Sequence, residues 1–178
     1  MIALAWILPA VVLLGLFVRA VALGYPPATL PEGSFFSRKE QAIVAACADA
    51  LFPPGGPIPF SGTEAGLLAY MDRYVGGLPP SPRLLGRLLF QSVEHATWIF
   101  GPRRVRFTRL RPEERIEALR IMAESTLYFR RVSFLSMRAM MTMGYLANPR
   151  VAESMHVRAN LAPFERRDAR APEEEVYA

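Results

Sequence analysis

The hydrophobic pattern of the chain begins with an uninterrupted apolar run. No charged residue occurs between Ile2 and Val18. A helix of about 20 apolar residues spans the hydrocarbon core of a bilayer, whereas a core helix of a soluble domain keeps a polar stripe. The run therefore predicts a transmembrane helix over residues 1–24. The side chains expected to contact lipid are Trp6, Leu13, Leu14 and Phe17.

Two interpretations of this segment compete, a cleaved signal peptide and a retained anchor. A signal peptide has a basic region before its apolar stretch, and no Lys or Arg precedes Ile2. Ala20-Val21-Ala22 has the small-x-small form of a cleavage site, which favours a cleaved signal peptide. We expect retention as a single-pass anchor.

After the apolar run the pattern changes to helical periodicity interrupted by proline and glycine, with no alternating strand. Residues 25–36 are a proline-rich linker expected to act as a spacer, residues 37–158 a helical domain and residues 159–178 an extended tail. The fold class is therefore all-α, with a compact bundle of about five helices behind the anchor and an irregular C-terminal tail.

Capping signals place the helices. The expected helix starts are the Ser37 to Glu40 capping box, Thr63, Ser81-Pro82, Pro112-Glu113-Glu114 and about Thr126; the expected ends are Phe52, Tyr74, Phe100 and Met143, the last with Gly144 as C-cap. Asn148-Pro149 predicts a further turn. The side chains expected to face the core are Leu85, Leu88, Leu89, Ser92, Ala96 and Ile99 in the third helix, Ile116, Leu119 and Met122 or Ala123 in the fourth, and Phe129, Val132, Leu135, Met137, Met140 and Met141 in the fifth.

Composition narrows the function classes. The net charge is +5, almost all of the basic residues are arginine, and there is one cysteine, Cys47. One cysteine excludes an internal disulfide and cysteine-rich metal or iron–sulfur sites. A basic chain suits anionic lipid, an acidic protein or nucleic acid. Nucleic acid is disfavoured because aromatic residues do not alternate with the basic ones.

Motifs for catalysis or cofactor binding are lacking. His95 and His156 are the only histidines, and neither forms a helical zinc motif, a covalent haem motif or part of a nucleotide-binding loop. We therefore expect no catalytic, cofactor-binding or metal-binding residue in this chain. The candidate interface for a partner or for lipid headgroups is the loop that carries Arg103, Arg104, Arg106, Arg109 and Arg111. The candidate contacts of the tail are Phe164, Arg166, Arg167 and Tyr177.

Four short motifs resemble the gluconate 2-dehydrogenase small-subunit (subunit 3) family. They are Glu40 to Pro53, Gly62 to Gly66 with Tyr70 to Arg73, Phe107 to Arg115, and Gly144 to Pro149. The resemblance implies a cofactor-free helical subunit of a periplasmic, membrane-associated dehydrogenase, whose flavin lies in a large subunit and whose electrons leave through a cytochrome c. Family members often carry a twin-arginine signal, and here an apolar anchor stands in its place.

The leading hypothesis is a non-catalytic accessory subunit that anchors or stabilises a bacterial membrane redox complex. That complex would be a flavin dehydrogenase or a respiratory or photosynthetic assembly, with flavin, haem or chlorophyll in the partner subunits. The resemblance implies a periplasmic body at the inner membrane, whereas Arg19, Arg38 and Lys39 beside the span favour the cytoplasm. The alternatives are a lipid-surface protein that uses the loop of Arg103 to Arg111, and a stand-alone enzyme.

Overall fold

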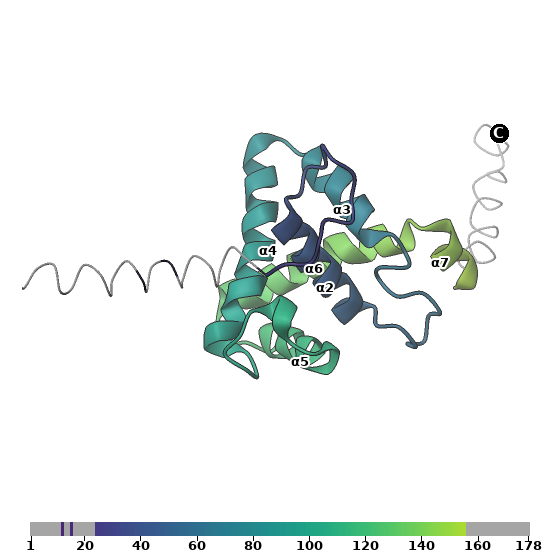
Figure 1. Ribbon diagram of the computed structural model, residues 1–178. Coiled ribbons are helices and arrows are strands. Elements are labelled where there is room, and N and C mark those ends of the chain that lie inside the picture. The colour runs from purple at the N-terminus through teal and green to yellow at the C-terminus, as the bar shows by residue number, and fades with distance from the viewer. Residues whose placement is uncertain (1–11, 13–14, 16–23, 156–178) are drawn as a thin grey trace, which may run out of the picture.

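The structure is a computed structural model that describes residues 12, 15 and 24–155. These residues form helices and no strand, so the all-α prediction is confirmed for this part of the chain. The elements are α2 (Arg38–Leu51), α3 (Leu67–Gly76), α4 (Pro80–Phe100), the 3₁₀ helix η1 (Phe107–Arg109), α5 (Pro112–Ala123), α6 (Tyr128–Leu146) and α7 (Pro149–Ser154) (Figure 1).

Within the described residues, no helix is both long and apolar enough to cross a membrane. Apart from positions 12, 15 and 24, the predicted anchor lies outside this part of the chain, and so does the whole of the predicted tail. The residues affected are Trp6, Leu13, Leu14, Phe17, Phe164, Arg166, Arg167 and Tyr177. Anchor and tail therefore remain predictions.

Helix α2 is the centre of the bundle and packs against α3, α4, α5 and η1. Its predicted capping box is present: the Ser37 hydroxyl accepts from the Glu40 amide, and the Glu40 carboxylate accepts from the Ser37 amide at 2.9 Å. The small residues of α2 let its neighbours approach closely, and Ile43, Val44 and Cys47 are fully buried. Cys47 is thus a core thiol, as its alanine-rich surroundings predict.

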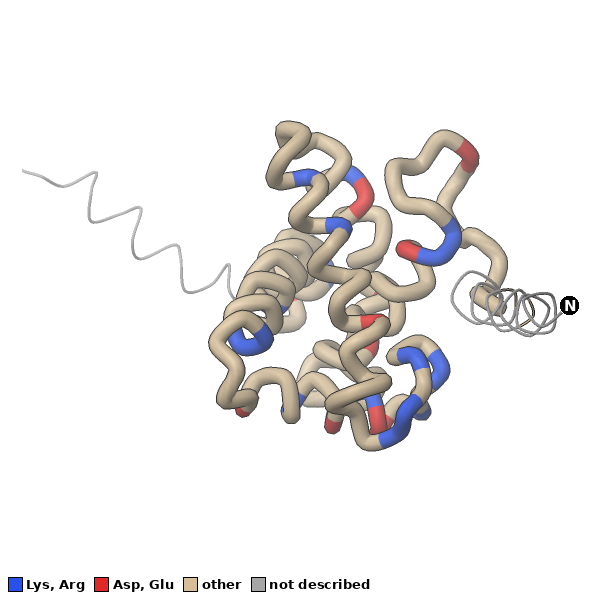
Figure 2. The backbone as a smooth tube through the Cα atoms, turned by 90° about the vertical axis from the view of Figure 1, so that its left-hand side faces the viewer, with Lys and Arg blue, Asp and Glu red and all other residues tan. Residues whose placement is uncertain are grey.

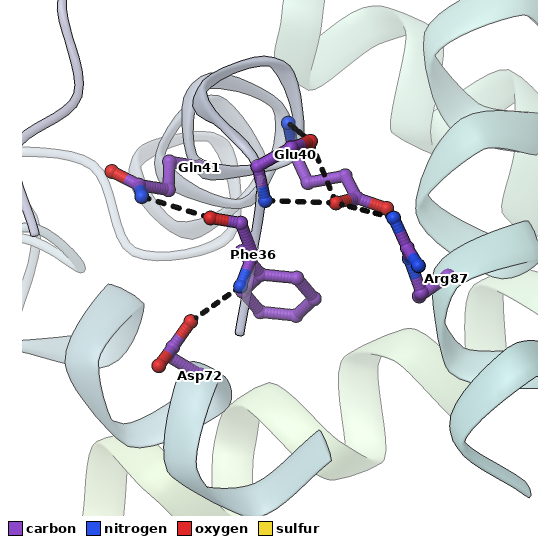
Figure 3. Close-up of polar contacts among 6 residues, drawn as sticks. Phe36, Glu40, Gln41, Asp72 and Arg87 are labelled. Atoms are coloured by element: carbon purple, nitrogen blue, oxygen red, sulfur yellow. Dashed lines mark hydrogen bonds and ion pairs between the residues drawn. The ribbon is translucent and has the colours of Figure 1, made fainter. Parts of the chain in front are cut away.

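Two polar contacts fix the start of α2 against the helices around it (Figure 3). The Phe36 amide donates to Asp72 of α3 at 2.8 Å, and Nε of Arg87 in α4 donates to Oε1 of Glu40 at 2.6 Å. Glu40 is almost completely buried. Burial alone would raise the pKa of Glu40, but the hydrogen bonds from Arg87 and Ser37 outweigh it and hold this pKa below its usual value.

The predicted core face of α4 is correct only in part, since Leu89 packs against the core. Leu85, Leu88 and Ile99 are exposed, and the buried residues of this helix are Gly86, Phe90, Val93, Glu94 and Thr97. The helix turns the face of Phe90, Val93 and Glu94 inward, because the Glu94 carboxylate finds hydrogen-bond donors inside the fold. The leucine-rich arc is therefore left on the surface.

Helices α5 and α6 also bury fewer of the expected residues. Leu119 and Met122 of α5 and Met137 and Met141 of α6 are buried. The partly buried residues are Ala123 of α5, Met140 of α6 and, from the predicted face of α4, Leu89, Ser92 and Ala96. Ile116, Phe129, Val132 and Leu135 are exposed, against prediction. Helix α6 packs most extensively against α3 and α5, and its contacts with α4 and α7 are fewer, so the residues on its outer side stay exposed.

Some helix ends differ from those predicted. Thr63 does not cap α3, which begins at Leu67; its amide and hydroxyl donate to Asp49 of α2 instead. Gly144 does not end α6, which continues to Leu146. A Cβ at this glycine would lie 2.3 Å from the Tyr70 ring, so its smallness serves the packing of α6 against α3. Asn148 caps the short α7.

Candidate functional site

An apolar groove lies between α4 and α6 on the surface of the described chain. It has a volume of about 510 Å³, and none of its lining residues carries a charge. Leu85, Leu88 and Leu89 form one wall, and Phe129, Val132 and Met140 form the other. Leu85 is 66% exposed and Phe129 is 74% exposed. Leu85 and Phe129 thus line a surface depression, whereas Leu89 and Met140 at its base also pack against the core.

An exposed apolar stripe on α6 extends this groove. It consists of Tyr128, Val132, Leu135, Ala139, Met143 and Leu146. Successive members are three or four residues apart, which is the pattern that packs one helix against another. Helix α6 crosses the molecule from the α4 side toward α7 (Figure 1), so the stripe follows the length of the body. We call the groove and the stripe together the α4/α6 face.

The size and chemistry of this face are those of an interaction surface. Monomeric soluble proteins rarely expose large continuous apolar patches, and such patches mark binding sites for proteins or membranes. Fully burying a leucine or phenylalanine side chain contributes about 1.5 to 3 kcal/mol. Several such side chains, presented together on two rigid helices, are sufficient for a specific docking site.

A second feature is a polar clamp on residues 25–30, the segment predicted to be a simple spacer. The Tyr25 hydroxyl donates to Oε1 of Glu94 at 2.8 Å. Arg38 donates to the carbonyls of Tyr25 and Pro26. Oε1 of Gln41 accepts from the amides of Thr29 and Leu30 at 3.0 and 3.1 Å. The segment is non-helical, as expected, but it is bound to the body along its length.

Glu94 is the buried centre of this clamp. Besides the Tyr25 hydroxyl, its carboxylate accepts from the amide and the hydroxyl of Thr108 at 3.0 and 2.8 Å. The guanidinium of Arg106, itself only 2% exposed, stacks 4.5 Å from the centre of the Tyr25 ring. Burial, followed by the hydrogen bond and charge of Glu94, raises the pKa of Tyr25 to about 12. Tyr25 therefore stays protonated and donates at any physiological pH.

The arginine loop is present, but its five arginines have different roles. Arg106 is buried in the clamp, and Arg103 and Arg111 pair with Glu114 at 3.7 and 3.1 Å. Arg104 and Arg109 are exposed and form no ion pair within the described residues. Figure 2 shows basic segments gathered at one edge of the side that carries α4. Of the five arginines in the predicted basic interface, Arg104 and Arg109 are thus the exposed ones without an ion pair to a described residue.

Within the described residues, His95 and Cys47 form no recognisable reactive centre. His95 lies 3.1 Å from Nζ of Lys39, and burial, then the charge of Lys39, lowers the pKa of His95. Burial raises the pKa of Cys47. Within the described chain, no three His, Cys, Asp or Glu side chains lie together in a group that could hold a metal ion. His156 lies outside the described residues.

Sequence reasoning missed the α4/α6 face because it assigned those same leucines to the core. A usable signal exists in the chain: α4 carries two apolar arcs, and one of them contains Phe90 and Val93 beside Glu94. Two apolar arcs on one helix favour a neighbour on each side.

The chain was compared with known proteins, and no family model, curated protein or solved structure matches it. The resemblance to the gluconate 2-dehydrogenase small-subunit family therefore remains a prediction.

Proposed function

We propose that this chain is a non-catalytic accessory subunit of a bacterial membrane complex, held by an N-terminal single-pass anchor. The single observation that carries the proposal is the α4/α6 face. A small helical body with an uncharged groove and a helical apolar stripe is built to hold another protein. The apolar run at the N-terminus keeps that body at a membrane.

The occupant of the face is a helix of a larger neighbouring subunit. The groove lies between two helices, and the stripe on α6 repeats in steps of three and four residues, so a third helix can pack its own side chains into both. No charge lines the groove. The partner helix should therefore present an apolar face, with polar residues at its margins.

The class of complex follows from the family resemblance. It is a redox or energy-converting assembly, either a flavin dehydrogenase or a respiratory or photosynthetic complex. Flavin, haem or chlorophyll would be bound by the partner subunits. In this arrangement the body lies on the periplasmic side of the inner membrane, and its contribution is assembly and stability of the partner.

The test is native purification of the full chain through a C-terminal tag, with a photo-crosslinking residue at position 135. We expect a stoichiometric larger complex, with the crosslink on a helix of one partner subunit. The absorption spectrum of the complex then distinguishes flavin, haem and chlorophyll. Recovery of a stable monomer alone would refute the proposal.

A matched pair of variants separates the face from general surface effects. Leu85→Glu with Leu135→Glu removes two buried leucines from the interface, a loss of about 4 kcal/mol or roughly a thousandfold in affinity. Ile116→Glu changes an exposed apolar residue of α5, which lies outside the α4/α6 face. The double variant should release the partner and the control should retain it. Equal retention by both variants would show that the face is not the interface.

A further inference from the structure

Four basic residues near Gly24 form a collar at the point where the described body begins. The collar consists of Arg38, Lys39, Arg106 and Arg109. A Cβ placed on Gly24 would lie 3.0 Å from a guanidinium nitrogen of Arg109 and 3.3 Å from one of Arg106. Arg38 holds the carbonyls of the next two residues. Two segments far apart in sequence therefore bring positive charge to one point of the chain.

The negative charge at this point is already satisfied. Glu94 is fully buried and accepts three hydrogen bonds from Tyr25 and Thr108. Arg38 and Arg109 are exposed at the surface, and Arg104 is exposed on the same loop as Arg109. The exposed charges of the collar itself are thus positive.

We propose that Arg104 and Arg109 bind the phosphate groups of anionic phospholipids in the membrane that the anchor enters. The inference rests on the proposed anchor, because the predicted span ends at Gly24 and the headgroup layer lies directly beyond it. A guanidinium donates two parallel hydrogen bonds to a phosphate. The clamp on Tyr25 holds the chain beside the collar at Gly24, the residue where the predicted span ends.

This contact would set which side of the body faces the bilayer. A basic residue near an anionic membrane contributes about a fivefold factor to association, so the two arginines together contribute roughly thirtyfold. That factor is sufficient to hold one orientation of a body that the anchor already keeps at the surface.

The test uses the full chain in proteoliposomes of phosphatidylcholine, alone or mixed with phosphatidylglycerol. A fluorophore on Glu113→Cys, an exposed position near the loop, transfers energy to a headgroup-labelled lipid. The buried Cys47 should not compete for the label. We expect stronger transfer in the anionic vesicles, reduced by added salt.

The decisive comparison is Arg104→Gln with Arg109→Gln against Arg73→Gln with Arg138→Gln. Both double variants remove two exposed arginines. The first should lower the ratio of docked to undocked bodies about thirtyfold in anionic vesicles, and the second should leave it unchanged. Equal responses of the two variants, or equal transfer in neutral and anionic vesicles, would overturn the proposal.

Two further readouts keep this inference separate from the proposed function. Resistance of the chain to alkaline extraction reports the anchor, and co-purification of the partner reports the α4/α6 face. Both should be unaffected in the Arg104 and Arg109 variant. If that variant keeps its lipid response but loses the partner, the loop binds protein and the lipid proposal is wrong.

Discussion

Replacing Arg87 by methionine should destabilise the fold, because it removes the guanidinium that pairs with a buried carboxylate. The Glu40 side chain is 3% exposed and the Arg87 side chain 44% exposed. Nε and one terminal nitrogen of Arg87 donate to Glu40 at 2.6 and 3.1 Å. Methionine keeps the aliphatic length of the side chain, so the loss is chiefly electrostatic.

The size of the effect depends on the hydrogen bonds that Glu40 keeps in the Arg87→Met variant. Breaking a fully buried ion pair costs about 3 to 5 kcal/mol, but solvent screens the half-exposed Arg87, and Glu40 retains two hydrogen bonds from Ser37. We therefore expect a loss of about 2 kcal/mol, as for one hydrogen bond to a charged group. For a chain of this size that loss corresponds to a fall of roughly 4 to 8 °C in Tm.

The pH dependence gives an independent check. The pKa of Glu40 is lower in the folded chain than its usual 4.5, so the unfolded chain binds more protons in this range. The stabilisation is present above pH 4.5 and is lost as the pH falls through the folded pKa. Arg87→Met should reduce this loss, because it removes the main hydrogen bonds that lower the pKa of Glu40.

The assay is urea unfolding of the full chain in a nonionic detergent, followed by circular dichroism at several pH values. Arg73→Met, at an exposed position without an ion pair to any described residue, is the control. A double-mutant cycle with Glu40→Gln isolates the pair. If Arg87→Met costs no more than Arg73→Met, or if both show the same pH profile, the stabilising role assigned to this pair is refuted.

Three further outcomes are expected. Tyr25→Phe should cost about 1 to 2 kcal/mol through the lost hydrogen bond to Glu94; it should also speed hydrogen exchange at Thr29 and Leu30, and unchanged exchange would contradict the clamp. Gly144→Ala should lower the free energy of unfolding by about 1 to 3 kcal/mol, since its Cβ would meet Tyr70. The control Ser136→Ala, at an exposed position, should leave this free energy unchanged. Thermal unfolding of the two variants tests the difference. His95 should titrate below pH 6.5 by NMR, and Lys39→Met should raise that midpoint; no change would exclude Lys39 as a cause.

The parts of the fold that sequence predicts well depend on neighbouring residues. The start of α2 follows from Ser37 and Glu40, three positions apart, and the start of α5 follows from Pro112 and two glutamates. Such signals act within one helical turn. They are independent of the rest of the fold, and both starts are confirmed.

The buried face of α4 could not be predicted in this way. Periodicity shows which residues are apolar, but it does not show which of two apolar arcs has a neighbour. Glu94 is buried because Tyr25, 69 positions earlier, and Thr108, 14 positions later, satisfy its carboxylate. Partners so distant in sequence leave no local pattern. The same limit applies to Gly144, whose requirement for a small residue comes from Tyr70 on another helix.

The clamp on residues 25–30 has a consequence for the thermodynamics of assembly. A body on a loose tether would sample many orientations, and a partner would have to immobilise it on binding. Here the hydrogen bonds that Arg38 and Tyr25 donate, and those that Gln41 accepts from Thr29 and Leu30, remove that freedom during folding. Much of the rotational entropy that would otherwise be lost on association is therefore lost on folding, before a partner binds. The proline-rich segment that follows the predicted anchor is thus held in one arrangement on the helical body.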